Sequence, residues 1–367
     1  MQIIEPKISL GLHSDLSAVC CDACIIKTDG LDILDRPVSI TRPYPGELRE
    51  TILSMRYPDD FTDAKRLSDL NARLTLEHTL VARELIDQVS RQIPKIDVIG
   101  YSGHLIHLDA RDKNAVVLGD GDRLAKQLKI PVVDRFIQTD LQADGVGEPL
   151  LPTFWEAITR PFEKPLGIIN LNGISRLIYI GPLGEQKAFD VGVGCLLLDR
   201  WVQRRAGIEM DFDGSLAEKG SPDDRLLSYL LKDDYLHRLP PKSLDRDDMD
   251  HLLTHVEGCS AVDGTATLTE FIIGSIVSSL PFLPERPKNW ILTGGGSLNP
   301  ALVLRLKRAL DGQVQTISEL DMPHYNLDAA GYAFLAVRSL MGLPISFPDT
   351  TGVATPLSGG LYHTTSE

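Results

Sequence analysis

Three consecutive glycines, Gly294 to Gly296, are the residues of this sequence that most clearly suggest chemistry. The apolar residues 290–292 precede them, and Pro300 opens an amphipathic segment at 301–310. This pattern predicts a strand, a glycine turn and a helix. Without Cβ atoms, the turn would let backbone amides and a helix start meet an anion or a nucleotide. A tight strand-to-helix turn with no ligand is an equally good interpretation.

Length and composition limit the possible classes of protein. The chain has 367 residues, 43% hydrophobic and 24% charged, which predicts a globular protein of two domains or one large α/β unit. The formal charge of -14 comes without a clustered basic surface, so we expect no nucleic-acid partner. No apolar run reaches the length of a membrane span, and residues 1–9 do not resemble a secretion signal, so we expect a cytoplasmic protein with no membrane partner.

Five cysteines, an odd number, fit a reducing compartment. Cys20, Cys21 and Cys24 lie close enough in sequence to suggest a metal or redox site. However, residues 10–28 have the pattern of two strands joined by a turn, and residues three apart in a strand point to opposite faces. Cys21 and Cys24 would therefore diverge, so we predict buried core thiols and no metal site.

The rest of the pattern alternates strands with helices. Expected strands cover residues 8–12, 23–28, 97–100, 115–118, 130–133, 166–171, 177–180, 187–189 and 314–317. Expected helices cover residues 67–90, 151–159, 196–206 and 329–341. The polar segment 211–248 is expected to cover a cleft. Strands that lead into glycine turns twice over resemble a duplicated nucleotide-binding fold of the sugar kinase, actin and Hsp70 type.

A set of short motifs occurs in a fixed order along the chain. These are Gly119-Asp120 before residues 130–133, Phe189-Asp190 before Gly192, and residues 242–246, 294–300, 351–353 and 356–360. Together they resemble the anhydro-N-acetylmuramic acid kinases of bacterial cell-wall recycling, over essentially the whole chain. Members of that family cleave the internal 1,6-anhydro bond with water while they transfer the γ-phosphoryl group of ATP, giving N-acetylmuramic acid 6-phosphate.

The resemblance implies a fold and a division into domains. We expect an α/β protein with a two-domain, duplicated ribonuclease-H-like fold of the actin-like ATPase type and a central interdomain cleft. The first domain would cover residues 1–130 and the second residues 131–341, and the tail at about 342–367 would pack back on the first. ATP and magnesium are the family's cofactors, and analogy with the family implies a homodimer.

Site residues follow from the same resemblance, motif by motif. Asp190 would be the general base that takes a proton from the attacking water. The nucleotide would contact Gly11, Ser14, Ser17, Gly192, Gly194, Gly294, Gly295, Gly296 and Asn299, and the substrate would contact Gly103, Asp140 and Lys242. Structural alternatives stay open, because an aspartate at a strand end can simply accept backbone amides, and an ion pair or a helix cap would explain Asp140 or Lys242.

The sequence departs from the family where phosphates would bind. The family motif G-L-M-S-G-T-S-L-D-G-V-D-A aligns without a gap with residues 11–23. Asp15 stands where the family has glycine, Leu16 where it has threonine, Val19 where it has an aspartate suited to magnesium, and Cys20 where it has glycine. A carboxylate about 5 Å from a phosphate oxygen costs on the order of 3 kcal/mol at an effective dielectric of about 20. We therefore predict that ATP with magnesium binds no tighter than millimolar.

Loops expected at the sugar site change in the same direction. Leu105 replaces a threonine, and Ile137 replaces the arginine expected to pair with the substrate carboxylate. Arg176 stands at the last asparagine of the family's N-x-G-G-x-x-N. Asp144 and Glu148 add carboxylates beside an anionic substrate. An aliphatic side chain cannot form a bidentate ion pair, so the substrate would lose its main charged partner.

Two hypotheses of different class remain. The favoured one is a catalytically silent paralogue, a pseudokinase whose fold serves binding or regulation in cell-wall recycling. The alternative is an active kinase of 1,6-anhydro-N-acetylmuramic acid or a related anhydrosugar, with a rebuilt phosphate site. Expected ligands are a small anhydrosugar or a nucleotide, and expected protein partners are a second copy of the chain or an active paralogue.

Overall fold

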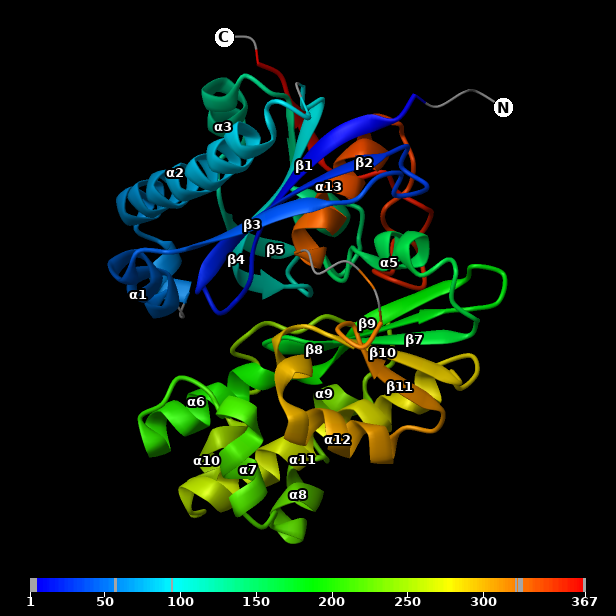
Figure 1. Ribbon diagram of the computed structural model, residues 1–367. Coiled ribbons are helices and arrows are strands. Elements are labelled where there is room, and N and C mark those ends of the chain that lie inside the picture. The colour runs from blue at the N-terminus through cyan, green and yellow to red at the C-terminus, as the bar shows by residue number, and fades with distance from the viewer. Residues whose placement is uncertain (1–4, 56–57, 94, 321, 323–325, 366–367) are drawn as a thin grey trace. The chain divides into compact units, whose positions relative to one another are not determined.

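The computed structural model describes residues 5–55, 58–93, 95–320, 322 and 326–365 (Figure 1). The chain forms two compact units. The first unit consists of Met1–Arg160 and Pro323–Glu367, and the second of Pro161–Met322. Each unit contains one mixed sheet with its own helices.

The first unit has a seven-stranded sheet in the order β12-β6-β4-β1-β2-β3, with β5 paired to β4. β1, β4 and β6 run parallel, whereas β2 pairs antiparallel with β1 and β3 antiparallel with β2. The strands are β1 (Lys7–Ser14), β2 (Cys20–Thr28), β3 (Val38–Pro43), β4 (Val98–Asp109), β5 (Asn114–Leu118), β6 (Val132–Asp134) and β12 (Leu361–His363). The helices are α1 (Gly46–Ser54), η1 (Pro58–Phe61), α2 (Ala64–Val89), α3 (Gly121–Leu128), α4 (Phe136–Gln142), α5 (Pro152–Ile158) and α13 (Leu327–Leu340).

Helices pack on both faces of this sheet. Leu10 and Leu12 of β1 lie in a buried cluster with Leu74 of α2. Gly11, between them, points the other way, since a Cβ atom there would lie 1.7 Å from the carbonyl oxygen of Ala329 in α13. Successive side chains of a strand point to opposite faces, so one strand supports both helices. Only glycine at position 11 allows α13 to approach this closely.

The second unit has a five-stranded sheet in the order β11-β10-β7-β8-β9. Its strands are β7 (Leu166–Leu171), β8 (Ile174–Ile180), β9 (Gln186–Val193), β10 (Asn289–Thr293) and β11 (Gln313–Thr316). The helices are α6 (Cys195–Ala206), η2 (Phe212–Gly214), α7 (Ser215–Lys219), α8 (Asp224–Leu230), α9 (Asp234–His237), α10 (Leu252–Val256), α11 (Ala261–Ser279), η3 (Leu280–Phe282), η4 (Gly295–Leu298) and α12 (Pro300–Ala309).

The two sheets repeat one strand order. In each sheet, three consecutive strands form an antiparallel meander. The first strand of the meander also pairs in parallel with a later strand, and that strand pairs in parallel with one more. The parallel strands are β1, β4 and β6 in the first sheet and β7, β10 and β11 in the second. The antiparallel partners are β2 and β3 in the first sheet and β8 and β9 in the second. This repetition confirms the predicted α/β class and the duplicated, actin-like fold.

The core of the second unit is a helix that the sequence pattern did not reveal. α11 is buried along most of its length and packs against α6, α7, α8 and β9. Among the described residues, Ala261–Phe282 is the one helical stretch long and apolar enough to cross a membrane, and most of its apolar part is buried inside the protein. A helix that is apolar on most sides is typical of a large core. The polar segment 211–248, expected to cover a cleft, supplies α7, α8 and α9, which pack on this helix.

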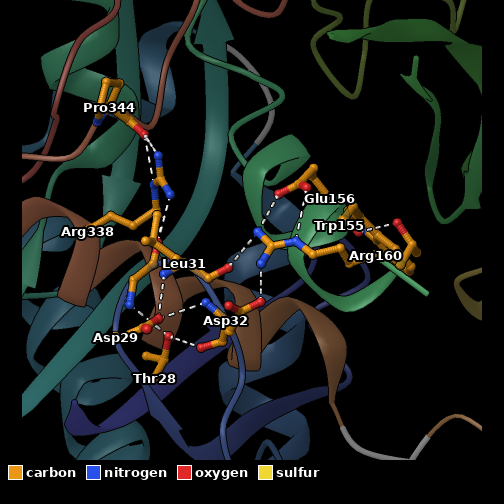
Figure 2. A network of polar contacts seen from close by, with 11 residues as sticks. Thr28, Asp29, Leu31, Asp32, Trp155, Glu156, Arg160, Arg338 and Pro344 are labelled. Atoms are coloured by element: carbon orange, nitrogen blue, oxygen red, sulfur yellow. Dashed lines mark hydrogen bonds and ion pairs between the residues drawn. The ribbon is translucent and has the colours of Figure 1, made fainter. Parts of the chain in front are cut away.

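The boundaries between the two units lie after Arg160 and Met322, whereas the sequence predicted them after residues 130 and 341. Arg160, two residues after the end of α5, forms an ion pair with Asp32 and donates to the carbonyl of Leu31 at 3.1 Å (Figure 2). Arg338 of α13 donates to the carbonyl of Gly30 at 2.7 Å and to that of Pro344 at 2.8 Å. The loop after β2 is therefore tied to α5 and to α13, so residues 131–160 and α13 belong with the first sheet. The tail lies in the same unit, where β12 pairs with β6.

Candidate active site

Asp190 lies near the end of β9, and its side chain is 0% exposed. Arg176 Nε donates to one carboxylate oxygen at 2.7 Å, and the amide of Leu244 donates to the other at 3.0 Å. The two charged residues are direct neighbours in the β8–β9 register. The backbone is fixed as well, since the hydroxyl of Tyr235 donates to the Asp190 carbonyl at 3.0 Å and the Asp190 amide donates to the Lys242 carbonyl at 3.1 Å. Asp190 is thus a firmly held, ion-paired carboxylate.

Lys242, predicted to contact the substrate, is turned into the protein. Its ammonium donates to the carbonyls of Tyr235 at 3.0 Å and Leu236 at 3.3 Å. The aromatic rings of Phe189, Tyr235 and Phe282 surround it at 4.6 to 5.9 Å. Burial lowers the pKa of Lys242 to about 8, although the charge of Asp190 opposes the shift. These contacts give Lys242 a structural role that needs no ligand.

The β1–β2 turn, predicted to hold phosphates, is closed by its own side chains. One carboxylate oxygen of Asp15 accepts the amide of Ser17 at 3.2 Å and its hydroxyl at 2.5 Å. Ser14 is buried and contacts Nδ1 of His104 at 2.8 Å. The hydroxyls of Ser14 and Ser17 are therefore engaged within the protein. Gly11 lies inside β1, where the contact with α13 accounts for it without a nucleotide.

In this turn the aspartate that the resemblance assigns to magnesium is replaced, and the carboxylate that is present, Asp15, bonds to Ser17. Val19, at the position of the family aspartate, is 43% exposed and offers no oxygen. Asp22 lies nearby in β2, but it accepts the hydroxyl of Thr41 at 2.6 Å, and burial raises its pKa. Among the residues that the structure describes, no three His, Cys, Asp or Glu side chains are grouped to hold a metal ion. Position 19 therefore supplies no ligand for magnesium, which prefers carboxylates.

Gly294 to Gly296 form the strand-to-helix turn that the sequence predicted. Gly294 has a φ of +80°, which favours glycine, and the amide of Gly295 donates to Asn172 Oδ1 at 3.0 Å. A Cβ atom on Gly295 would meet nothing within 4 Å, whereas one on Gly296 would meet Leu171 and Cys195. Gly295 is thus the open position of this turn.

The other predicted nucleotide residues of the second unit have structural contacts. Asn299 caps α12, because its side chain accepts the amides of Ala301 at 3.0 Å and Leu302 at 3.2 Å. Gly192 is buried in β9. The amide of Gly194 donates to the carbonyl of Gly173 at 2.8 Å, just before α6 begins. None of these contacts requires a ligand.

Asp140 and Gly103, predicted to contact the substrate, differ in accessibility. Asp140 is 0% exposed and accepts the Gly147 amide at 2.8 Å and the Thr351 hydroxyl at 2.6 Å. Burial raises the pKa of this carboxyl. It joins α4 to the C-terminal tail and is not available to a substrate. Gly103 lies at an irregular point of β4 and lines a pocket.

The cysteines and Arg176 can also be compared with what the sequence predicted. The predicted core thiols are confirmed for Cys21 and Cys24, which are 0% exposed, and burial raises the pKa of both. The sequence motif showed Arg176 as a substitution, but not its contact with Asp190. That contact depends on the register of β8 and β9, for which the sequence contains no direct signal.

The two sheets with the same strand order give the chain the fold of the sugar kinases and actin-like ATPases. The family model for anhydro-N-acetylmuramic acid kinase matches residues 7–364. The chain therefore belongs to the anhydro-N-acetylmuramic acid kinase family.

Two curated relatives agree with this assignment. The chain is 36% identical to the anhydro-N-acetylmuramic acid kinase of Rhodospirillum rubrum, over 96% of this chain and 93% of the relative. It is 34% identical to that of Paramagnetospirillum magneticum, over 97% of this chain and 99% of the relative. Among solved structures it is similar to component A of the (R)-2-hydroxyglutaryl-CoA dehydratase of Acidaminococcus fermentans, with 10% identity, a TM-score of 0.48, and coverage of 91% of this chain and 99% of that chain.

Proposed function

We propose that this chain is a catalytically silent member of its family, a pseudokinase that serves binding or regulation in cell-wall recycling. The ion pair between Arg176 and Asp190 carries the proposal. A general base needs a carboxylate oxygen that the attacking water can reach, and Asp190 is 0% exposed. Here one oxygen of Asp190 accepts Arg176 Nε at 2.7 Å and the other accepts the Leu244 amide at 3.0 Å. Each oxygen thus already accepts one hydrogen bond, one of them from a charged guanidinium, and the arginine stands where the family has an uncharged asparagine.

The β1–β2 turn supports the same proposal. Asp15 bonds to the amide and hydroxyl of Ser17, so its negative charge lies in the turn that would receive phosphates. At about 5 Å from a phosphate oxygen such a charge costs on the order of 3 kcal/mol, more than a hundredfold in affinity. Val19 supplies no ligand for a compensating metal ion.

Two measurements test the proposal. Isothermal titration calorimetry with ATP and magnesium should give a dissociation constant in the millimolar range or weaker. A coupled assay with ATP and 1,6-anhydro-N-acetylmuramic acid should give no product above that of the Asp190→Asn variant. A low micromolar dissociation constant for ATP, or turnover that disappears in Asp190→Asn, would overturn the proposal.

A second candidate is an active, ATP-dependent kinase that converts 1,6-anhydro-N-acetylmuramic acid, or a related anhydrosugar, to its 6-phosphate with ring opening. The similarity over nearly the whole chain to relatives named anhydro-N-acetylmuramic acid kinase favours this candidate, and so does the retention of Asp190. The assay above separates the two candidates. An active enzyme would require Arg176 to leave Asp190 when the sugar binds, so Arg176→Asn would raise its turnover.

Location and partners belong to the same proposal. We infer a cytoplasmic protein, because the most apolar helix is a core helix of the second unit. The family resemblance supports a homodimer or a complex with an active paralogue. Sedimentation of the chain alone and with such a paralogue, followed by kinase assays of the mixture, tests this part.

A further inference from the structure

His13 lies near the end of β1, directly before the β1–β2 turn. The family motif that aligns with residues 11–23 has methionine at this position. A methionine side chain carries no charge, whereas histidine is the side chain whose charge ordinarily changes between about pH 5 and pH 8. The substitution therefore makes the charge beside this turn depend on pH.

Hydrogen bonds determine which ring nitrogen of His13 can take up a proton. The hydroxyl of Ser102 donates to the carbonyl of Gly103 at 2.8 Å, so its oxygen is the acceptor for Nδ1 of His13 at 3.1 Å. In the neutral ring, Nε2 then carries the lone pair, and it lies 3.8 Å from a carboxylate oxygen of Asp328. The ring also stacks on Tyr332, with 5.5 Å between the ring centroids, which holds this orientation. A proton at Nε2 thus turns the contact with Asp328 into an ion pair.

Three carboxylates from different elements lie around this imidazole. Asp22 is the direct neighbour of His13 in the β1–β2 register. Asp328 lies in the first turn of α13, and Asp15 lies in the β1–β2 turn itself. Burial raises the pKa of Asp22, and the charges of Asp15 and Asp328 raise it further. The hydroxyl of Thr41 and the charge of His13 oppose this shift in the pKa, so the four titratable groups respond to one another.

The neighbouring strands and helices carry further titratable or charged groups, namely Cys20, Cys21, Arg42, Glu77, His78 and His104. Burial raises the pKa of both cysteines, that of Cys20 to about 12, so both thiols stay neutral. Arg42 and Glu77 pair with each other at 3.2 Å. Burial lowers the pKa of His78 to about 3, and the side chains of His78 and His104 are 0% exposed. Of the three imidazoles, His13 is the one that solvent reaches, with 17% of its side chain exposed.

We propose that His13 makes nucleotide binding at the β1–β2 turn sensitive to acid, so that the turn binds phosphates more tightly when His13 is protonated. With a neutral imidazole, the carboxylates of Asp15, Asp22 and Asp328 oppose a polyanion. With a protonated imidazole, Nε2 pairs with Asp328, and the phosphates meet less negative charge. The inference rests on the proposed function, because it takes the low affinity for ATP to arise from the charge of this turn.

Ligand-observed NMR titrations of the full chain with ATP and magnesium at pH 6.0 and pH 8.0 test the proposal. Binding should be about tenfold tighter at pH 6.0. His13→Gln should reduce this ratio to less than about threefold, because an amide can bond to Ser102 without titrating. The ratio that remains in His13→Gln measures the titration of the nucleotide phosphates themselves. His255→Gln, at an exposed position of α10, is the matched control and should keep the tenfold ratio.

Asp328→Asn tests the carboxylates independently of His13. It removes one negative charge and should tighten ATP binding at pH 8.0 by about fivefold or more, with a melting temperature that shows a folded chain. No ATP binding at either pH, or unchanged affinity in a folded Asp328→Asn protein, would overturn the inference. Millimolar binding with the same pH dependence in His13→Gln would overturn it too and leave the pseudokinase proposal intact. Low micromolar binding at pH 8.0, with a tenfold ratio that requires His13, would overturn the pseudokinase proposal and support this inference.

Discussion

Arg176 and Asp190 face each other because the register of β8 and β9 makes them direct neighbours. The carboxylate is fully buried, while 22% of the arginine side chain is exposed. A buried charge that loses its partner is strongly destabilising, whereas removal of both partners is often tolerated. A substitution of Arg176 therefore removes the charged partner of the Asp190 carboxylate, the candidate general base.

At this residue scale, Arg176→Met should lower the free energy of unfolding by about 2 to 4 kcal/mol, because it leaves the Asp190 carboxylate without its cation. The double variant Arg176→Met, Asp190→Asn should recover part of that loss. Urea denaturation of the unaltered chain, both single variants and the double variant gives the coupling energy. Additive losses would show that the ion pair has no energetic significance.

His78 makes the first unit sensitive to acid. Its imidazole lies between the hydroxyls of Tyr44 at 2.9 Å and Tyr101 at 2.8 Å, and burial lowers its pKa from 6.5 to about 3. Between these pH values the unfolded chain binds a proton that the folded chain does not. Stability is therefore full above about pH 6.5 and falls as the pH decreases toward 3, by up to about 1.4 kcal/mol per pH unit.

His78→Gln should flatten this dependence, because an amide can bond to both tyrosines but does not titrate in this range. Urea denaturation at pH 4.5 and pH 7 of the variant and the unaltered chain measures the difference. His255→Gln, at an exposed position of α10, is the control and should leave the pH dependence unchanged. An equal loss of stability at pH 4.5 in the His78 variant would exclude His78 as the acid-sensitive group.

At the scale of elements, α13 depends on glycines of the strands beneath it. A Cβ atom at Gly11 would lie 1.7 Å from the Ala329 carbonyl oxygen, and one at Gly100 would lie 1.9 Å from that of Tyr332. Both contacts are with backbone, which cannot rotate away. The helix would have to move off the sheet to admit either methyl group.

Gly11→Ala should therefore lower the free energy of unfolding by about 3 kcal/mol or more. Gly295→Ala, where a Cβ meets nothing within 4 Å, should leave stability within about 0.5 kcal/mol. Thermal and urea unfolding of the two variants provide the comparison. A Gly11→Ala protein as stable as the unaltered chain would show that the approach of α13 does not require glycine at position 11.

The sequence predicted elements well where the pattern was amphipathic. The strand pair at 8–12 and 23–28, the helix at 67–90 and the turn at 294–296 are confirmed as β1, β2, α2 and the start of η4. α11 was not predicted, because a helix buried on most sides shows no apolar stripe. Motif spacing located Asp190 and Asp140 but not their partners. Arg176 meets Asp190 through the register of β8 and β9, and Thr351 reaches Asp140 from the distant C-terminal tail.

At the scale of the whole molecule, the second unit is one continuous segment, Pro161–Met322, whereas the first is assembled from both ends of the chain. β6, α4, α5 and α13 pack with the first sheet, although all of them lie after residue 130. A fragment that starts at residue 131 therefore carries apolar surfaces whose partners are missing.

Two fragments test this division of the chain. The fragment 161–322 should unfold cooperatively and bind little of a dye specific for exposed apolar surface, because it contains a complete sheet and α11. The fragment 131–341 should bind the dye strongly and aggregate, because α13 lies almost wholly buried in the full chain and would be uncovered. Circular dichroism in urea, dye fluorescence and light scattering measure the three properties. A monomeric 131–341 fragment that unfolds as cooperatively as 161–322 would show that α13 can pack without the first sheet.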